Sequence, residues 1–360
     1  MKNTSNNKKI WVDIVNPSDA LFFGGLIHHS KDTELSITLR QRAETIELAS
    51  LFGLNGKVIG KDRTQPVLKI CSVLIRMLKL LVQTPKHDIS LSFENASTVV
   101  CSKIRRKKSV MFCDNDLKFI QKSNKSQDID TLLKLAADYI VIPEACYNTF
   151  KQHVDEKKLI TYKGYKEDIY IANYVPDPNF LKEIPFEHYV VLRPEALGSF
   201  YVSEKVSITQ QLLTELVNHG FNVVYLPREG KDREYATNNS EHIFIPDHAL
   251  NGLDLCYYSD AVLTGSGTMC REAACLGKKS VSFFPGNNLL SVDQKLVDEK
   301  RVLHSRDVGE IVQYLVDNSN DSIYRNNSWE VKNNLISKLV QQVNIPIDIC
   351  ERSEGAIEAP

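Results

Sequence analysis

The 360-residue sequence lacks the features by which several classes of protein are recognised. None of its eight cysteines forms a C-x-x-C pair, and most lie in apolar segments. This pattern disfavours zinc sites and disulfides, so we expect buried free thiols in a reducing cytoplasm. The net charge is −1, without the basic excess of a dedicated nucleic-acid binder, so no nucleic-acid partner is expected.

The sequence also lacks a long apolar run. No stretch reaches the length of a transmembrane helix, and residues 1–9 are polar and basic with no signal-peptide core behind them. These features predict a cytoplasmic protein. The most apolar helix, expected over 67–82, is interrupted by Lys69, Arg76 and Lys79. With the basic run 103–108 it could touch an anionic membrane surface, or it could pack on a sheet beside a solvated loop.

What is present is the composition and pattern of an α/β protein. Hydrophobic residues make up 42% and charged residues 25% of the chain, as in soluble globular proteins, and the length suggests two domains. Short apolar runs alternate with helical patterns and no internal repeat is visible, which predicts βαβ units around parallel sheets. We expect a Rossmann-like domain over 1–168, a linker over 169–186, a second Rossmann-like domain over 187–348 whose final helix packs back on the first, and a disordered tail over 349–360. Strands are expected at 10–15, 35–39, 57–59, 89–93, 109–113 and 138–142 in the first half, and at 189–192, 222–226, 242–246, 261–263 and 280–284 in the second.

The stretch 252–284 organises the second half around a glycine turn. An apolar strand at 261–263 leads through Gly265, Ser266, Gly267 and Thr268 into a helix that ends before Gly277. The N–H groups that begin a helix have no partner within it, and the glycines would let a ligand approach them closely while the hydroxyls add donors. The turn therefore suits a phosphate or diphosphate. Alternatively, it is a plain strand-to-helix turn with a Ser or Thr cap.

Two charged residues could complete such a site. Glu272 lies about one helical turn beyond the glycines, where it could meet the sugar part of a nucleotide, or it could serve the helix dipole or a cap. Arg193 ends the expected strand at 189–192, where its guanidinium could offset diphosphate charge through a forked contact. Otherwise it is an exposed surface arginine.

The first half carries carboxylates after its strands, where parallel sheets bind ligands. The turns at 16–19 and 40–42 are therefore candidate cleft residues. Asp114-Asn115-Asp116 fits the D-x-D pattern of metal-binding glycosyltransferases, but so does 128–130, and a helix terminus can serve a diphosphate without a metal. We expect Asp114 to be a general base, or else a turn or cap residue. Glu144 is a second candidate carboxylate, or a first-turn helix residue.

Short motifs spread along the chain form a recognisable set. They include Asn16-Pro17, Phe22-Phe23, Pro143-Glu144, Arg193-Pro194, Pro227-Arg228, Tyr257 to Ala261, Gly265 to Met269, Arg271 to Ala274, Leu276-Gly277, Ser282 to Gly286 and Leu303 to Asp307. Through these motifs the sequence resembles the domain of unknown function 354 family over nearly its whole length, most densely at 250–310. The members are similar to GT-B proteins related to UDP-N-acetylglucosamine 2-epimerase and to nucleotide-sugar glycosyltransferases. One departure is Ser18-Asp19, which stands where the family usually has Pro-His after Asn-Pro.

The resemblance implies a GT-B-like fold with two Rossmann-type doubly wound domains facing a central cleft. It also implies a nucleotide-sugar donor, UDP-linked, with no separate cofactor and no metal. The implied donor-binding residues are Arg193, Arg228, Gly265, Ser266, Gly267, Thr268 and Glu272.

Three functions are compatible with these features. The first is a metal-independent glycosyltransferase of surface polysaccharide or glycoconjugate synthesis, in which Asp114, Asp19 or Glu144 deprotonates an unknown acceptor. The second is an isomerase like the non-hydrolysing 2-epimerase, although Asn16-Pro17-Ser18-Asp19 replaces the Gly-Thr-Arg-Pro-Glu start of those enzymes. The third is a non-catalytic nucleotide-sugar binder.

Overall fold

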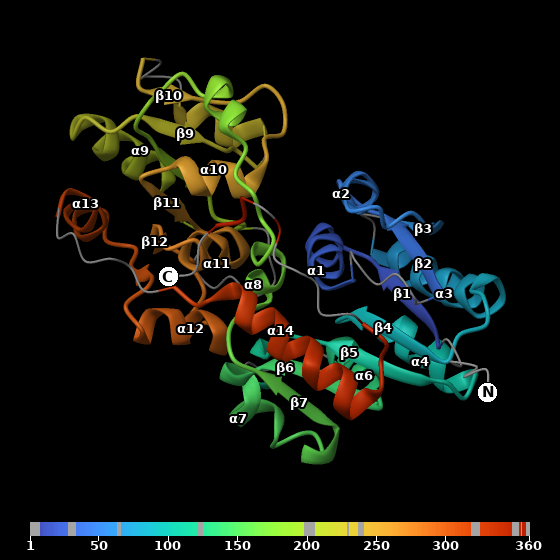
Figure 1. The fold of residues 1–360 in the computed structure, drawn as a ribbon. Helices are drawn as coiled ribbons and strands as arrows, with labels where there is room; N and C mark the ends of the chain where they lie inside the picture. Colours follow the sequence, from blue (N-terminus) through green and yellow to red (C-terminus); the bar gives the residue numbers. More distant parts are fainter. Residues whose placement is uncertain are drawn as a thin grey trace. The chain divides into compact units, whose positions relative to one another are not determined.

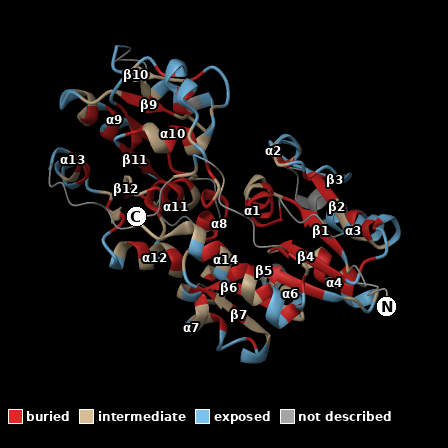
Figure 2. Ribbon diagram, viewed as in Figure 1, coloured by how far each residue is buried: buried red, intermediate tan, exposed pale blue. Residues whose placement is uncertain are grey.

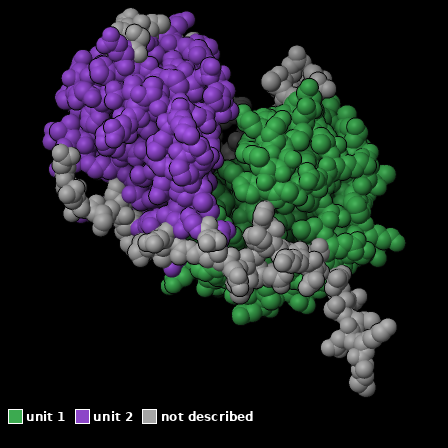
Figure 3. Space-filling model, turned by 45° about the horizontal axis from the view of Figure 1, so that its top comes forward, with its two compact units in different colours: residues 1–173, 328–352 green, residues 174–327, 353–360 purple. Residues whose placement is uncertain are grey.

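The chain folds into two compact α/β units, drawn in Figure 1 and coloured separately in Figure 3. The first unit contains residues 1–173 and 328–352, and the second contains residues 174–327 and 353–360. The computed structural model describes residues 8–27, 34–62, 66–120, 125–197, 206–228, 230–236, 241–317, 325–347, 353 and 355–357.

The first unit is built on a parallel sheet of seven strands in the order β3-β2-β1-β4-β5-β6-β7. The strand order reverses between β1 and β4, as in doubly wound folds. The strands are β1 (Lys9–Ile14), β2 (Glu34–Gln41), β3 (Lys57–Lys61), β4 (Ile89–Phe93), β5 (Lys108–Phe112), β6 (Tyr139–Pro143) and β7 (Leu159–Tyr162).

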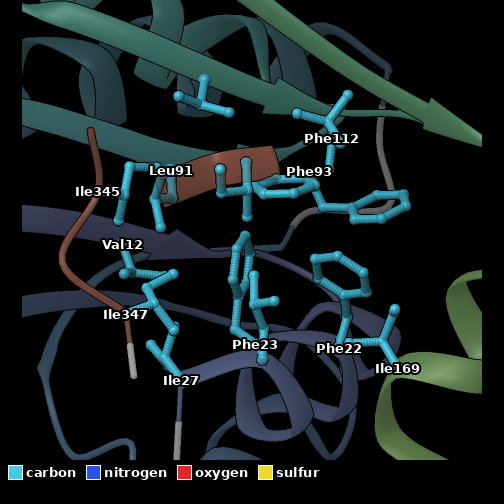
Figure 4. Close-up of a cluster of buried hydrophobic side chains, with 14 of the residues drawn as sticks. Val12, Phe22, Phe23, Ile27, Leu91, Phe93, Phe112, Ile169, Ile345 and Ile347 are labelled. Atoms are coloured by element: carbon cyan, nitrogen blue, oxygen red, sulfur yellow. The ribbon is translucent and has the colours of Figure 1, made fainter. Parts of the chain in front are cut away.

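Helices cover this sheet and close its core. The rings of Phe22 and Phe23 on α1 pack with those of Phe93 and Phe112, with centroids 5.0 to 5.7 Å apart (Figure 4). Leu335 on α14 is fully buried in the same cluster, which explains why the last helix belongs to the first unit. The helices are α1 (Pro17–Ile27), α2 (Thr45–Leu51), α3 (Pro66–Gln83), α4 (Ala96–Ile104), α5 (Leu117–Ile120), α6 (Lys125–Leu135), α7 (Tyr147–Phe150), α8 (Lys166–Ile171) and α14 (Ser328–Lys338), which continues as a π-helical turn at Leu339–Val343.

The second unit repeats the plan with a parallel sheet of six strands in the order β10-β9-β8-β11-β12-β13. Its core joins apolar side chains of these strands to those of α9 and α13. The strands are β8 (Val190–Arg193), β9 (Val223–Tyr225), β10 (Ile243–Phe244), β11 (Ala261–Thr264), β12 (Lys279–Ser282) and β13 (Leu303–His304). The helices are α9 (Thr209–Asn218), α10 (Gly252–Tyr258), α11 (Gly267–Cys275), α12 (Ser291–Asp298) and α13 (Val308–Val316).

Some local predictions were wrong. Of the turn expected at 16–19, the last three residues already belong to α1, which begins at Pro17. Arg40 and Gln41 belong to β2 rather than to a turn. Cys71 is exposed, although the other described cysteines are buried free thiols, and Cys350 lies outside the described residues.

The segment 169–186, expected as a linker, holds the end of α8 and a 3-10 helix at Pro178–Glu183. The two units divide between Asn173 and Tyr174. Most of the tail expected at 349–360 lies outside the described residues. In the described part of the chain, no helix combines the length and the apolar character needed to cross a membrane.

Candidate functional site

The glycine turn of the second unit lies where the strand order of its sheet reverses. β8 and β11 are neighbours in register, with Thr264 opposite Arg193, and the Gly265 N–H donates to the Arg193 carbonyl at 3.1 Å. Ligands of doubly wound folds bind beyond the carboxyl ends of the strands at such a reversal. The turn at 265–268 and Arg193 therefore lie where doubly wound folds bind their ligands.

The turn leads directly into α11. Ser266 is the N-cap residue, and its side chain makes no capping hydrogen bond. The Ser266 hydroxyl instead lies 3.1 Å from the Thr264 hydroxyl, which also accepts from the Ser266 N–H at 3.1 Å. Ser266, Gly267 and Thr268 are all half-buried. The first turn of α11 thus presents a helix N-terminus with hydroxyl groups beside it, which suits an anionic group.

Both glycines of the turn also have neighbours within the protein. A Cβ on Gly265 would lie 2.5 Å from the Cα of Glu195, and a Cβ on Gly267 would lie 2.6 Å from Nη1 of Arg271. The Arg271 guanidinium in turn donates to Asp293 at 2.8 Å. The contact with the Glu195 backbone requires glycine at position 265 without any ligand, so this glycine by itself does not identify a binding site.

Glu272 and Arg193 both act electrostatically on one buried thiol, that of Cys256. Burial raises the pKa of Cys256, the nearby Glu272 carboxylate raises it further, and Arg193 lowers it. Glu272 is 7% exposed and Arg193 is half-buried. The acidic side chain comes from α11 and the basic one from the end of β8, and both lie within electrostatic range of Cys256.

The loops after β8 and β9 are fixed by two carboxylates. Arg228 donates through Nε to the Pro194 carbonyl at 2.8 Å, and its N–H donates to Asp232 at 3.0 Å. Glu195 accepts from Thr209, at the start of α9, at 2.7 Å and pairs with Arg306 at 3.2 Å. Arg193 thus ends β8, and Arg228 follows the neighbouring strand β9 at the same anchored edge of the sheet.

Asp19 is the first of three candidate carboxylates in the first unit. It is 1% exposed and lies in the first turn of α1, and its Oδ2 accepts from the N–H groups of Val15 at 3.1 Å and Asn16 at 2.9 Å. Burial raises its pKa to about 7, although these hydrogen bonds and the charge of Lys166 act in the opposite direction. Asp19 therefore both organises the turn after β1 and can exchange a proton near neutral pH.

Asp114 lies beyond β5 and is paired with a lysine from a distant part of the chain. Its Oδ2 is 3.1 Å from Nζ of Lys166, and both side chains are buried. The Lys166 ammonium also lies 5.1 Å from the centre of the Phe93 ring. Because Lys166 acts on both Asp19 and Asp114, these two candidates belong to one charged cluster at the carboxyl edge of the sheet.

Glu144 differs from the other two carboxylates because it is exposed. It begins the 3-10 helix Glu144–Cys146, directly after β6.

Within the described residues, no group of three or more His, Cys, Asp and Glu side chains could hold a metal ion.

The sequence analysis did not single out Lys166 or Glu94. Glu94 follows β4 with a φ of 46°, and its carboxylate accepts from the Asn115 N–H at 3.0 Å. Left-handed backbone in a residue other than glycine is strained, and such strain concentrates at functional sites. The sequence gives no signal for either residue. Glu94 is distinguished by its backbone angle, and Lys166 by its contact with Asp114, which lies far away in the chain.

One fully buried charged group has a structural role. Asp13, near the carboxyl end of β1, is 0% exposed and forms a forked pair with Arg76 at 2.6 and 3.0 Å. Thr38, Asn95 and Thr98 also donate to its carboxylate at 2.5 to 2.8 Å. This network fixes α3 and α4 to the sheet.

The sequence matches a protein family over most of its length. The family described as "Protein of unknown function (DUF354)" matches residues 8–344. An uncharacterised protein of Methanocaldococcus jannaschii, MJ0665, is 24% identical over 326 residues, covering 87% of this chain and 92% of its own.

Solved structures of nucleotide-sugar enzymes are similar in fold. The M. jannaschii UDP-N-acetylglucosamine 2-epimerase, solved with UDP-N-acetylglucosamine and UDP, has a TM-score of 0.69 at 13% identity, covering 92% of this chain and 99% of its own. The glycotransferase of kitacinnamycin has a TM-score of 0.56 at 10% identity, covering 96% and 97%. The fold is therefore GT-B-like, as predicted.

Proposed function

Because the chain belongs to the DUF354 family of proteins of unknown function and has a GT-B-like fold, we propose that it is an enzyme acting on a nucleoside-diphosphate sugar. The observation that carries the proposal is the turn at 265–268, which joins β11 to α11 at the strand reversal beside Arg193. A diphosphate at the α11 N-terminus would be held by N–H groups, hydroxyls and a guanidinium. UDP is the first nucleotide to test, since the similar epimerase was solved with it.

We propose glycosyl transfer, without a metal, as the reaction. Donors held at the diphosphate stabilise the charge that develops as the diphosphate leaves, and each well-placed donor is worth roughly 3 kcal/mol of barrier. Ser266 and Thr268 supply the hydroxyl donors in this scheme, and Glu272 binds the ribose. Asp114 is the first candidate for the base that deprotonates the acceptor, because Lys166 can stabilise its charged form. Asp19 and Glu144 are the alternatives.

Epimerisation of the sugar is the second candidate function. It is favoured by the solved 2-epimerases among the structures of similar fold. Asp19, with a pKa of about 7, could serve a step that removes and returns a proton. The two reactions are separable because epimerisation needs no acceptor.

The first experiment is a thermal-stabilisation screen with UDP, GDP, CMP, dTDP, ADP and their sugars. A ligand at a hundredfold its Kd adds about 2.7 kcal/mol of stability. We expect one nucleotide to stabilise the protein and Ser266→Trp to abolish the effect, while the control Thr214→Trp, on the exposed face of α9, retains it. Failure of every nucleotide to stabilise the wild-type protein would refute the proposed function.

The second experiment separates the two reactions. The protein is incubated in deuterated water with the sugar nucleotide that stabilises it, and the sugar is analysed by mass spectrometry. Deuterium in the sugar without any acceptor would establish epimerisation and refute transfer. Glycosyl transfer predicts an unlabelled sugar and the release of nucleoside diphosphate only when an acceptor is added.

A further inference from the structure

Helix α3 exposes an apolar stripe. Leu74, Ile75, Leu78 and Val82 are 51%, 53%, 60% and 84% exposed, and their spacing puts them on one face of the helix. We call these four residues the outer stripe. Figure 2 colours the exposed residues of α3 pale blue. On the opposite side of the helix, the buried Leu80 clusters with Trp11 and Ile59 of the sheet. Large apolar side chains gathered on one exposed face indicate an interaction surface.

A basic cluster lies at the end of the same helix. The Arg105 guanidinium donates to the carbonyls of Leu81 at 2.5 Å, Thr84 at 2.9 Å and Pro85 at 3.1 Å, which fixes the end of α4 to the end of α3. Nearby in sequence are four exposed basic side chains: Lys79, Lys86, Lys103 and Arg106. The apolar stripe and the basic side chains thus occupy neighbouring parts of one surface.

The charge of this region differs from that of the rest of the chain. Residues 71–108 contain eight Lys and Arg against two acidic residues, a net charge of +6. The whole chain has 44 basic and 45 acidic residues, so the remainder has 36 against 43, a net charge of −7. Lysine and arginine are therefore enriched in the part of the sequence that carries the outer stripe, and Arg76 is the one among them that is buried against Asp13.

We propose that the outer stripe of α3 and the basic cluster beside it bind an anionic membrane surface. Apolar side chains of an interfacial helix enter the boundary between headgroups and acyl chains, while lysine and arginine side chains pair with anionic headgroups. A second copy of the chain would match the apolar stripe but would bring two copies of the basic cluster together. The charge therefore favours an anionic lipid surface over self-association.

The test is flotation of the full chain with vesicles. We expect binding to vesicles that contain phosphatidylglycerol, loss of binding in high salt, and no binding to pure phosphatidylcholine. Leu78→Glu is expected to weaken binding at least tenfold, because it removes an inserted side chain and adds a negative charge. Lys79→Gln and Lys86→Gln are expected to weaken it roughly fivefold each.

The matched control is Leu132→Glu on α6. Leu132 is 68% exposed, close to the value for Leu78, but α6 carries Asp128 and Asp130 instead of a basic cluster. This control is expected to bind like the wild type. Absence of binding by the wild type, or equal binding by the Leu78 variant, would overturn the proposal. So would a dimer in solution that Leu78→Glu dissociates, because the stripe would then be an interface between copies.

Discussion

Asp19 makes the stability of the first unit depend on pH in a direction that can be worked out from its surroundings. Burial raises the pKa of Asp19 from 3.8 to about 7, so the folded protein holds this proton more tightly than the unfolded chain does. Its contribution to stability is therefore complete below about pH 4 and is lost as the pH rises to about 7. A pKa difference of about three corresponds to about 4 kcal/mol, at about 1.4 kcal/mol for each pKa unit.

Asp19→Asn isolates this effect. The amide oxygen can still accept from the N–H groups of Val15 and Asn16, but the side chain no longer ionises. We expect the variant to gain stability over the wild type as the pH rises, by up to about 4 kcal/mol between about pH 4 and pH 8.

The assay is urea unfolding followed by tryptophan fluorescence. Both tryptophans of the chain, Trp11 and Trp329, belong to the first unit, so the signal reports on the unit that contains Asp19. Asp138→Asn is the matched control. Burial tends to raise the pKa of Asp138, but its hydrogen bonds with Lys103 and Ser109 outweigh this effect and lower it. That carboxylate therefore stays ionised over this range, and its variant should differ from the wild type by a nearly constant amount. A constant difference for Asp19→Asn as well would refute the reasoning.

Three further substitutions test the packing around the two sheets. Gly265→Ala should destabilise the second unit by about 1–3 kcal/mol, measured by thermal unfolding, since its Cβ would overlap the backbone of Glu195; an unchanged melting temperature would contradict this contact. Arg76→Ala should destabilise the first unit by about 3–5 kcal/mol in urea, because it leaves the buried Asp13 carboxylate without its charged partner; a loss below 1 kcal/mol would show that solvent reaches Asp13. Asn251→Ala should lower the free energy of unfolding by about 1 kcal/mol, because the Asn251 side chain caps α10 by accepting from two N–H groups. A loss no larger than that of an exposed alanine substitution on α9 would exclude the cap.

Much of the fold could be predicted from the sequence because buried parallel strands are short apolar runs between turns. The expected strand at 89–93 is β4, and the expected helix at 67–82 lies within α3. The start of α1 was misplaced because Asn16-Pro17-Ser18-Asp19 has the composition of a turn. In the structure Pro17 is the first helical residue, and Asp19 accepts from the N–H groups before it.

The candidate site was less predictable, because its chemistry depends on contacts between distant segments. The spacing of Asp114 after a strand was visible, but its partner Lys166 is 52 positions away and lies on another element. The raised pKa of Asp19 is likewise invisible in the sequence, since it results from burial beneath neighbouring elements. The position of Asp114 after a strand could therefore be predicted from the sequence, but the ionisation state of Asp19 could not.

In the glycine turn, the position of the residues in the fold is stronger evidence for a ligand site than the residue types are. The backbone of Glu195 already accounts for Gly265, so a turn that binds nothing would need the same glycine. The turn lies at the strand reversal, with Arg193 on the neighbouring strand and hydroxyls on both sides of Gly267. A purely structural turn would not require this location. Substitution of Gly265 should therefore disturb folding whether or not a nucleotide binds. Substitution of Ser266, which is half-buried at the N-cap, should affect binding with little effect on folding. That difference distinguishes a binding turn from a structural one.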